Sequence, residues 1–172
     1  MFDFLFHLVQ GFTSQIDIIG RLLLAAVLGA MLGFEREYVG KSAGLRTYML
    51  VSLGSALFTI LSVEAFPGFE GIASFDPSRI ISQIVVGVGF IGAGIIIFEQ
   101  RESKVRGLTT AAGLWVIAAI GSAVGLKFYF VSIFLTLFIM IILSGSRYFR
   151  VEEKIHRLSE RMNPNDDQES FK

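Results

Sequence analysis

The feature that most constrains this chain is a series of five long apolar stretches separated by short polar connections. The stretches cover approximately residues 18–34, 45–63, 80–98, 108–124 and 128–143. A helix needs about 20 mostly apolar residues, within a range of about 17–25, to cross a hydrocarbon core about 30 Å thick. Because lipid offers the backbone no hydrogen-bonding partners, such runs are typical of membrane-spanning helices. We therefore predict an all-α, polytopic membrane protein with five transmembrane helices.

Composition agrees with this class and excludes several chemistries. Hydrophobic residues make up 53% of the chain and charged residues 17%, against about 45–50% and about 25% in soluble domains. The absence of cysteine excludes disulfides, thiolate metal sites and cysteine nucleophiles. The 15 basic residues balance the 15 acidic residues, so we expect no nucleic-acid partner. His7 and His156 have no nucleophile beside them, so we expect no enzymatic activity.

The distribution of Lys and Arg predicts the orientation of the chain, because basic residues concentrate in cytoplasmic loops. If the N-terminus lies outside, twelve of the fifteen basic residues fall on the inner loops and the C-terminal tail. Arg79 and Lys127 then lie on the outer side, and Arg21 lies inside the first stretch. We predict that the N-terminus lies outside and the C-terminus inside. The partner expected around the helices is the lipid bilayer.

Three parts are expected: an interfacial segment at 1–17, a five-helix membrane domain at 18–146 and a cytoplasmic amphipathic tail at 147–172. In the tail, Val151, Ile155, Leu158 and Met162 recur at helical spacing, which favours a helix lying on anionic lipid or against a partner. Within the membrane domain, residues 33–47 resemble residues 94–110. One interpretation of this similarity is that the domain consists of two related hairpins plus one extra helix. The alternative is that small residues recur by chance.

Small residues predict where the helices approach one another, since close backbone contact replaces the hydrophobic effect as the packing force in lipid. The expected packing glycines are Gly29, Gly33, Gly87, Gly89, Gly92 and Gly94. Residues 87–92 also match the dinucleotide-binding string GxGxxG, but that fingerprint requires a soluble strand, turn and helix. Because five helices offer little interior, some glycine seams are expected to face a second copy of the chain, with a dimer favoured.

Charged and hydroxyl residues gather at the predicted cytoplasmic ends of the first four stretches. They are Glu35, Arg36, Arg46, Thr47, Glu99, Arg106, Thr109 and Thr110. One interpretation is a structural salt-bridge network, because an unpaired charge is costly in a low dielectric. A second is that Glu35 and Glu99 hold hydrated Mg²⁺, the one cofactor considered, which binds through one or two carboxylates. A third is that the arginines bind an anionic lipid head group or phosphate.

Two polar side chains lie inside the apolar stretches themselves. Arg21 has Asp17 four residues earlier, so an exposed helical ion pair with a snorkelling side chain is the simplest interpretation. A functional role is the alternative, because charged residues are rare within membrane spans. Gln83 is the main polar side chain of the third stretch. A loosely acidic, solvated loop is expected around Glu64, Glu70 and Asp76.

The order and spacing of several strings resemble the MgtC/SapB family of bacterial membrane proteins. The strings are Arg21-Leu22-Leu23 with Gly29, Gly33, Glu35 and Arg36; residues 43–47 (AGLRT); residues 76–80 (DPSRI) with Gln83; residues 87–94 (GVGFIGAG); and residues 105–112 (VRGLTTAA) followed by Trp115. Together they cover roughly residues 21–125. The resemblance marks Asp76 and Arg79 as a motif on the outer side.

The resemblance implies a bacterial inner-membrane protein linked to magnesium limitation, to acid or host-associated stress and, in some members, to virulence. It implies that some relatives regulate membrane machines, so an ATP synthase or another membrane ATPase is a candidate partner. Two departures stand out: Thr109 replaces an Asn of some members, and a short tail follows Leu143 where regulatory members often carry a soluble domain. We expect a non-enzymatic regulator in magnesium homeostasis; the alternative is a small oligomeric transporter or channel for magnesium or another ion.

Overall fold

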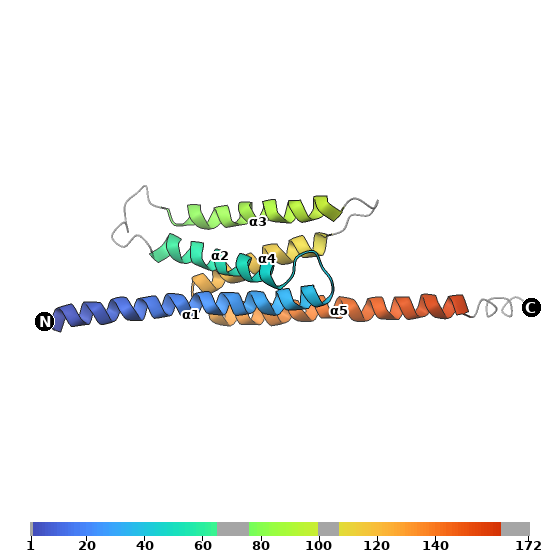
Figure 1. Cartoon of the computed structure of the whole chain (residues 1–172), viewed down its shortest axis with the longest axis horizontal. Coiled ribbons are helices and arrows are strands. Elements are labelled where there is room, and N and C mark those ends of the chain that lie inside the picture. Colours follow the sequence, from blue (N-terminus) through green and yellow to red (C-terminus); the bar gives the residue numbers. More distant parts are fainter. Residues whose placement is uncertain (1, 65–75, 100–106, 163–172) are drawn as a thin grey trace, which may run out of the picture. The chain divides into compact units, whose positions relative to one another are not determined.

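The computed structural model describes the backbone of residues 2–64, 76–99 and 107–162, and the side chains of 13–64, 76–96 and 107–145. Five α-helices follow one another in the chain, as Figure 1 shows: α1 (Phe2–Tyr38), α2 (Leu45–Glu64), α3 (Ser78–Glu99), α4 (Leu108–Gly125) and α5 (Tyr129–Met162). No strand occurs in these described ranges. The predicted all-α class with five helices is confirmed.

Four of the helices contain a segment long and apolar enough to cross a membrane. These segments are Thr13–Tyr38, Leu45–Glu64, Ser78–Ile96 and Leu108–Gly125. The fifth helix carries a shorter apolar segment, Tyr129–Gly145. At 1.5 Å per residue it extends about 25 Å, close to the lower limit for a bilayer. The protein is therefore a multi-pass membrane protein, while the predicted orientation stays a prediction.

The first and last helices continue beyond their apolar segments. α1 runs without a break from Phe2 to Tyr38, and α5 runs from Tyr129 to Met162. The predicted segment 1–17 thus continues into the first span as one helix, and α5 passes the predicted boundary at residue 146. The chain forms two compact units, Met1–Thr136 and Leu137–Lys172, whose boundary lies within α5. Where lipid begins and ends along these two helices stays a prediction.

The buried core lies where α1, α2 and α4 meet, and α3 packs against α2 and α4 (Figure 1). The largest fully buried side chains of this core include Leu32 of α1, Tyr48 of α2, and Leu114 and Ile117 of α4. In contrast, only 11% of the apolar segment of α3 is buried, against 50% of that of α4. α3 is therefore the least covered of the four spanning helices.

Two glycines of α1 allow its backbone to lie directly against that of α2. A Cβ atom at Gly29 would come within 2.7 Å of the Tyr48 carbonyl oxygen, and one at Gly33 within 2.8 Å of the Leu45 Cα atom. Real Cβ atoms do not approach backbone this closely, so a side chain would force the helices apart. Such small-residue crossings are the means by which helices associate in lipid.

α4 uses the same device on another side of α2. A Cβ atom at Gly121 would collide with the carbonyl group of Ser52, and one at Gly125 would lie 2.9 Å from the carbonyl oxygen of Ala56. α2 is consequently held between two glycine seams.

The glycines of α3 have different surroundings. A Cβ atom at Gly92 would lie 3.4 Å from the Ala111 side chain, whereas one at Gly87, Gly89 or Gly94 would meet no described atom within 4 Å. Within this chain, Gly92 is therefore the member of this set that lies against another helix. The other three leave open space along α3.

α4 ends in a Schellman motif, in which the chain reverses after a residue in the left-handed conformation. The Lys127 N–H donates to the Val124 carbonyl at 2.9 Å, and the Phe128 N–H donates to the Ala123 carbonyl at 2.9 Å. Lys127 itself has φ 67°, the one positive φ at a non-glycine residue in the described backbone. Glycine is the usual residue at this position because it has no Cβ. The backbone conformation therefore does not explain why a lysine occupies this position.

Candidate functional site

Polar side chains collect at the two opposite ends of the α1–α2–α4 core. We call the group at one end the Arg21 cluster; it consists of Asp17, Arg21, Glu64 and Lys127. We call the group at the other end the Glu35 cluster; it consists of Glu35, Arg36, Tyr48 and Thr110. Because α2 and α4 both run antiparallel to α1, each cluster draws on more than one helix.

Arg21 is the centre of the first cluster, with only 2% of its surface exposed. Its Nη1 and Nη2 atoms donate to Oε1 and Oε2 of Glu64, at 2.8 Å each. Nη1 also donates to the Gly125 carbonyl at 2.9 Å, and Nη2 lies 3.0 Å from Oδ2 of Asp17. The planar guanidinium suits such a bidentate pair. One side chain thus joins the ends of α1, α2 and α4.

Lys127 completes the charge balance of this cluster. Its Nζ lies 3.1 Å from Oδ2 of Asp17 and 4.0 Å from Oε1 of Glu64. Two cations therefore face two carboxylates, and the left-handed turn at Lys127 is what brings its ammonium group to them. Among the described residues, Arg21 Nε is the one buried side-chain nitrogen or oxygen without a hydrogen-bond partner. The balanced charges of the Arg21 cluster identify it as a clamp between helices.

In the Glu35 cluster the ion pair joins two neighbouring residues of α1. Glu35 and Arg36 are both buried, and the Arg36 Nε donates a short hydrogen bond to Oε2 of Glu35. Tyr48 is fully buried beside them, and its hydroxyl donates a long hydrogen bond, 3.4 Å, to the Thr110 carbonyl. Since an arginine already compensates the Glu35 carboxylate, this carboxylate alone does not make a site for a bare cation.

The other predicted cytoplasmic residues are only partly described. Arg46 and Thr109 are exposed, whereas Thr47 is half-buried. Glu99 is the last residue of α3, but its side chain lies outside the described residues, as does Arg106 altogether. No three His, Cys, Asp or Glu side chains come together as metal ligands in the part of the chain that could be searched. A cation site between Glu35 and Glu99 therefore stays a prediction.

A buried row of hydroxyl groups connects the two clusters along one face of α2. It comprises Ser52, Ser55, Thr59 and Ser62. The Ser52 hydroxyl donates to the Ala25 carbonyl at 2.7 Å, the Thr59 hydroxyl donates to the Ser55 carbonyl at 2.8 Å, and the Ser62 hydroxyl donates to the Pro77 carbonyl. These hydroxyls bond to backbone, and glycine seams press against the same helix. For Ser52, Thr59 and Ser62 the row is a satisfied, close-packed contact.

Asp76 and Arg79 lie at the start of α3. Oδ1 of Asp76 accepts hydrogen bonds from the Ser78 N–H at 2.9 Å and the Ser78 hydroxyl at 2.6 Å. These bonds, with the nearby Arg79, lower the pKa of Asp76 below its usual value. The Arg79 Nε lies 3.8 Å from Oδ2 of Asp76, and both side chains are exposed. Asp76 therefore caps the helix, while Arg79 extends from it.

Sequence reasoning missed the main partner of Arg21. Glu64 was expected in a solvated loop, but it is the last residue of α2 and holds the guanidinium of Arg21. A signal was present: both residues fall at the same predicted face of the membrane, and a buried arginine needs a counter-charge. Lys127 and Tyr48 were missed as well, because only the fold brings them to the two clusters.

A family model and several curated proteins match this chain over most of its membrane-spanning part. A family model described as the MgtC family matches residues 22–151. The putative magnesium transporter YhiD of Escherichia coli K12 is 45% identical over 129 residues, which are 74% of this chain and 59% of YhiD. Protein SrpB of Synechococcus elongatus is 40% identical over 147 residues, 78% of this chain and 79% of SrpB. Protein MgtC of Salmonella typhimurium LT2 is 47% identical over 105 residues, 61% of this chain and 42% of MgtC.

The chain spans about three-fifths of the length of YhiD and a smaller share of MgtC. No solved structure matches it significantly. The matched region contains α1 from Leu22 onward, all of α2, α3 and α4, and the whole apolar segment of α5.

Proposed function

Because this chain belongs to the MgtC family, we propose that it is a non-enzymatic inner-membrane protein that acts in magnesium homeostasis and stress adaptation by regulating a partner membrane complex. The name of its relative YhiD, putative magnesium transporter, supports the link with magnesium. The partner we propose is an ATP synthase or another membrane ATPase, contacted helix to helix within the bilayer.

The observation that carries the regulator proposal is the closed packing of the α1–α2–α4 core. Glycine seams bring α1 and α4 against the backbone of α2, and the buried hydroxyls of α2 bond to carbonyl groups. The two charged clusters at the ends are compensated by their own ion pairs. Such an interior favours a rigid body that presents its outer surface over a conduit for hydrated ions.

α3 offers a surface for helix contact on its exposed side. Val86, Gly89, Phe90 and Ala93 share one side of α3, because their numbers differ by three, four or seven between successive turns, and all four are exposed. We call them the Phe90 stripe, after a side chain that is 82% exposed. A Cβ atom at Gly89 would meet no described atom within 4 Å, so another helix can approach the backbone there. A partner subunit or a second copy of the chain fits this stripe.

ATP-driven proton pumping by inverted membrane vesicles tests the proposal. Vesicles with the full chain are expected to pump at a different rate from vesicles without it, and the partner ATPase is expected to co-purify. Gly89→Leu is expected to abolish both effects, because the leucine blocks close helix approach. Gly20→Leu on α1 is the matched control, since Gly20 also has open space around it. Equal pumping with and without the wild-type chain contradicts the proposal.

The name of YhiD also favours a second candidate function, magnesium transport by a small oligomer. Since the core of one chain is closed, the pathway would have to form between copies. Liposomes loaded with a magnesium-sensitive dye distinguish the two functions. Flux that depends on the full chain, is lost in Glu35→Gln or Glu99→Gln and is kept in the exposed control Glu37→Gln supports transport and overturns the regulator proposal.

A further inference from the structure

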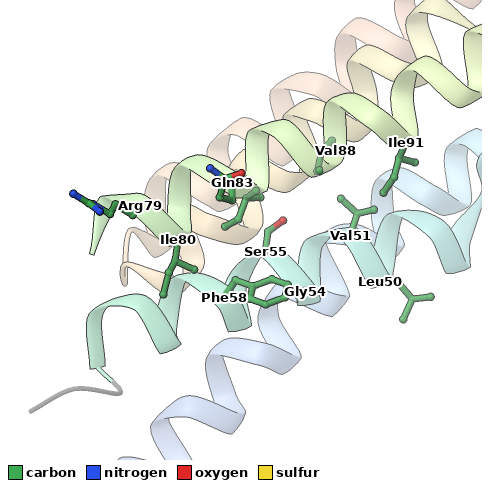
Figure 2. A pocket seen from close by; sticks show the side chains of 12 residues that line it. Leu50, Val51, Gly54, Ser55, Phe58, Arg79, Ile80, Gln83, Val88 and Ile91 are labelled. Carbon is green, nitrogen blue, oxygen red and sulfur yellow. The ribbon is translucent and has the colours of Figure 1, made fainter. Parts of the chain in front are cut away.

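A groove of about 640 Å³ runs between α2 and α3, apart from the closed core. Figure 2 shows its walls: Phe58 and Gly54 belong to α2, while Ile80, Gln83, Val88 and Ile91 belong to α3. Gly54 and Gly87 leave its middle wide, because a Cβ atom at either would meet no described atom within 4 Å. The volume falls within the range of about 300–1,000 Å³ that small-molecule sites occupy.

The length of the groove corresponds to one leaflet of a bilayer. Its lining on α3 extends from Arg79 to Ile91, and the twelve helical steps between these residues span about 18 Å. Half of a hydrocarbon core of about 30 Å is about 15 Å. The groove lies alongside a membrane-spanning segment, so its natural surroundings are lipid chains and not water. One extended acyl chain fits these dimensions.

The polar groups of the groove are unevenly distributed along it. Arg79, 79% exposed, stands at the end where α3 begins, and Gln83 follows one turn farther in; Ser55 of α2 is the third polar residue of the lining. The opposite end is lined by Leu50 and Ile91, which are apolar. A phospholipid has the same order, with a phosphate at one end and hydrocarbon at the other. The Arg79 guanidinium suits a phosphate, and Gln83 can hydrogen-bond to the ester groups below it.

We propose that this groove binds one anionic phospholipid, with an acyl chain between α2 and α3 and the phosphate at Arg79. The ion pair between Arg79 Nε and Asp76 is long and exposed, so it competes weakly. A helix of a second copy would cover the apolar walls, but it would leave the charge at one end unexplained. The lipid accounts for the length, the polarity and the open glycines together.

Electron spin resonance with nitroxide-labelled lipid tests this proposal on the full chain in phosphatidylcholine vesicles. The wild-type chain is expected to immobilise labelled phosphatidylglycerol more strongly than labelled phosphatidylcholine. Gly87→Leu, which fills the groove, is expected to lose this lipid. Gly94→Leu, on the same helix with equally open surroundings but outside the groove, is expected to keep it. Both variants need to remain monodisperse after purification.

Arg79→Gln tests the contact with the phosphate independently of the acyl chain. Because the Arg79 side chain is exposed, we expect its replacement to leave the folding of the groove unchanged. The preference for phosphatidylglycerol is expected to fall about fivefold, as for the loss of one basic residue near an anionic surface. Three results would overturn the proposal: equal immobilisation in Gly87→Leu and Gly94→Leu, no head-group preference in the wild-type chain, or disulfide-linked dimers of Phe58→Cys forming undiminished in excess lipid. The last would assign the groove to a second copy.

Discussion

Arg21 and Glu64 join the first two spanning helices through two parallel hydrogen bonds of 2.8 Å, although 43 residues separate them in the chain. Arg21 is buried, whereas about a third of the Glu64 side chain is exposed. The pair therefore joins a buried charge to a counter-charge that is partly exposed. This arrangement reduces the desolvation penalty that two fully buried charges would have.

Glu64→Gln is expected to lower the free energy of unfolding by about 1.5–3 kcal/mol, the range for a hydrogen bond to a charged group. The guanidinium of Arg21 stays buried but loses its main counter-charge. Denaturant unfolding in detergent micelles measures the change. Asp76→Asn is the matched control: its ion pair with Arg79 is long and exposed, and Asn also caps helices, so no change is expected. Equal stability of both variants would contradict the clamp.

Gly121→Ala is expected to destabilise the protein by about 1–3 kcal/mol, as overpacking of a tight contact does. The new methyl group would collide with the carbonyl group of Ser52. Gly94→Ala, which meets open space on α3, is expected to leave stability unchanged or raise it by up to about 1 kcal/mol through helix propensity. Thermal unfolding of the two purified variants checks the difference, and a tolerated alanine at residue 121 would refute the close seam.

Lys127→Gly is expected to be more stable than Lys127→Ala by about 1 kcal/mol, because glycine adopts a positive φ without strain. Both variants lose the ion pairs to Asp17 and Glu64, so their difference isolates the backbone conformation. Parallel denaturation curves measure it. If alanine were as stable as glycine, the left-handed turn would not exist in solution.

The orientation of the chain is testable because it contains no cysteine. Phe128→Cys and Ser42→Cys place single, exposed thiols at opposite ends of the helices. A membrane-impermeant maleimide is expected to label Phe128→Cys in intact cells and to label Ser42→Cys only after the membrane is opened. The reverse pattern would invert the predicted orientation.

Helix positions followed closely from hydropathy. The stretches predicted at 45–63 and 108–124 correspond to α2 (Leu45–Glu64) and α4 (Leu108–Gly125) within one residue at each end. This agreement has a physical reason, since the thickness of the bilayer selects the length of an apolar run. α1 and α5 extend much farther than their apolar parts, because a helix can continue into water where hydropathy no longer marks it.

The candidate site was less accessible to sequence reasoning. Gly29 and Gly89 look alike in the sequence, yet one lies against the backbone of α2 and the other meets open space. Only the arrangement of the neighbouring helices distinguishes them. The same holds for Glu64, whose role depends on the distance to Arg21 after the chain has folded back.

The separation of Arg21 from Glu64 also has a consequence for biogenesis. When a ribosome has delivered only α1 to the membrane, the carboxylate that pairs with Arg21 is that of Asp17, one turn away, because Glu64 comes 43 residues after Arg21 in the chain. The guanidinium acquires its bidentate acceptor only once α2 emerges. The first two helices should accordingly enter the bilayer as a hairpin, and a nascent chain halted before Glu64 should leave the insertion machinery poorly.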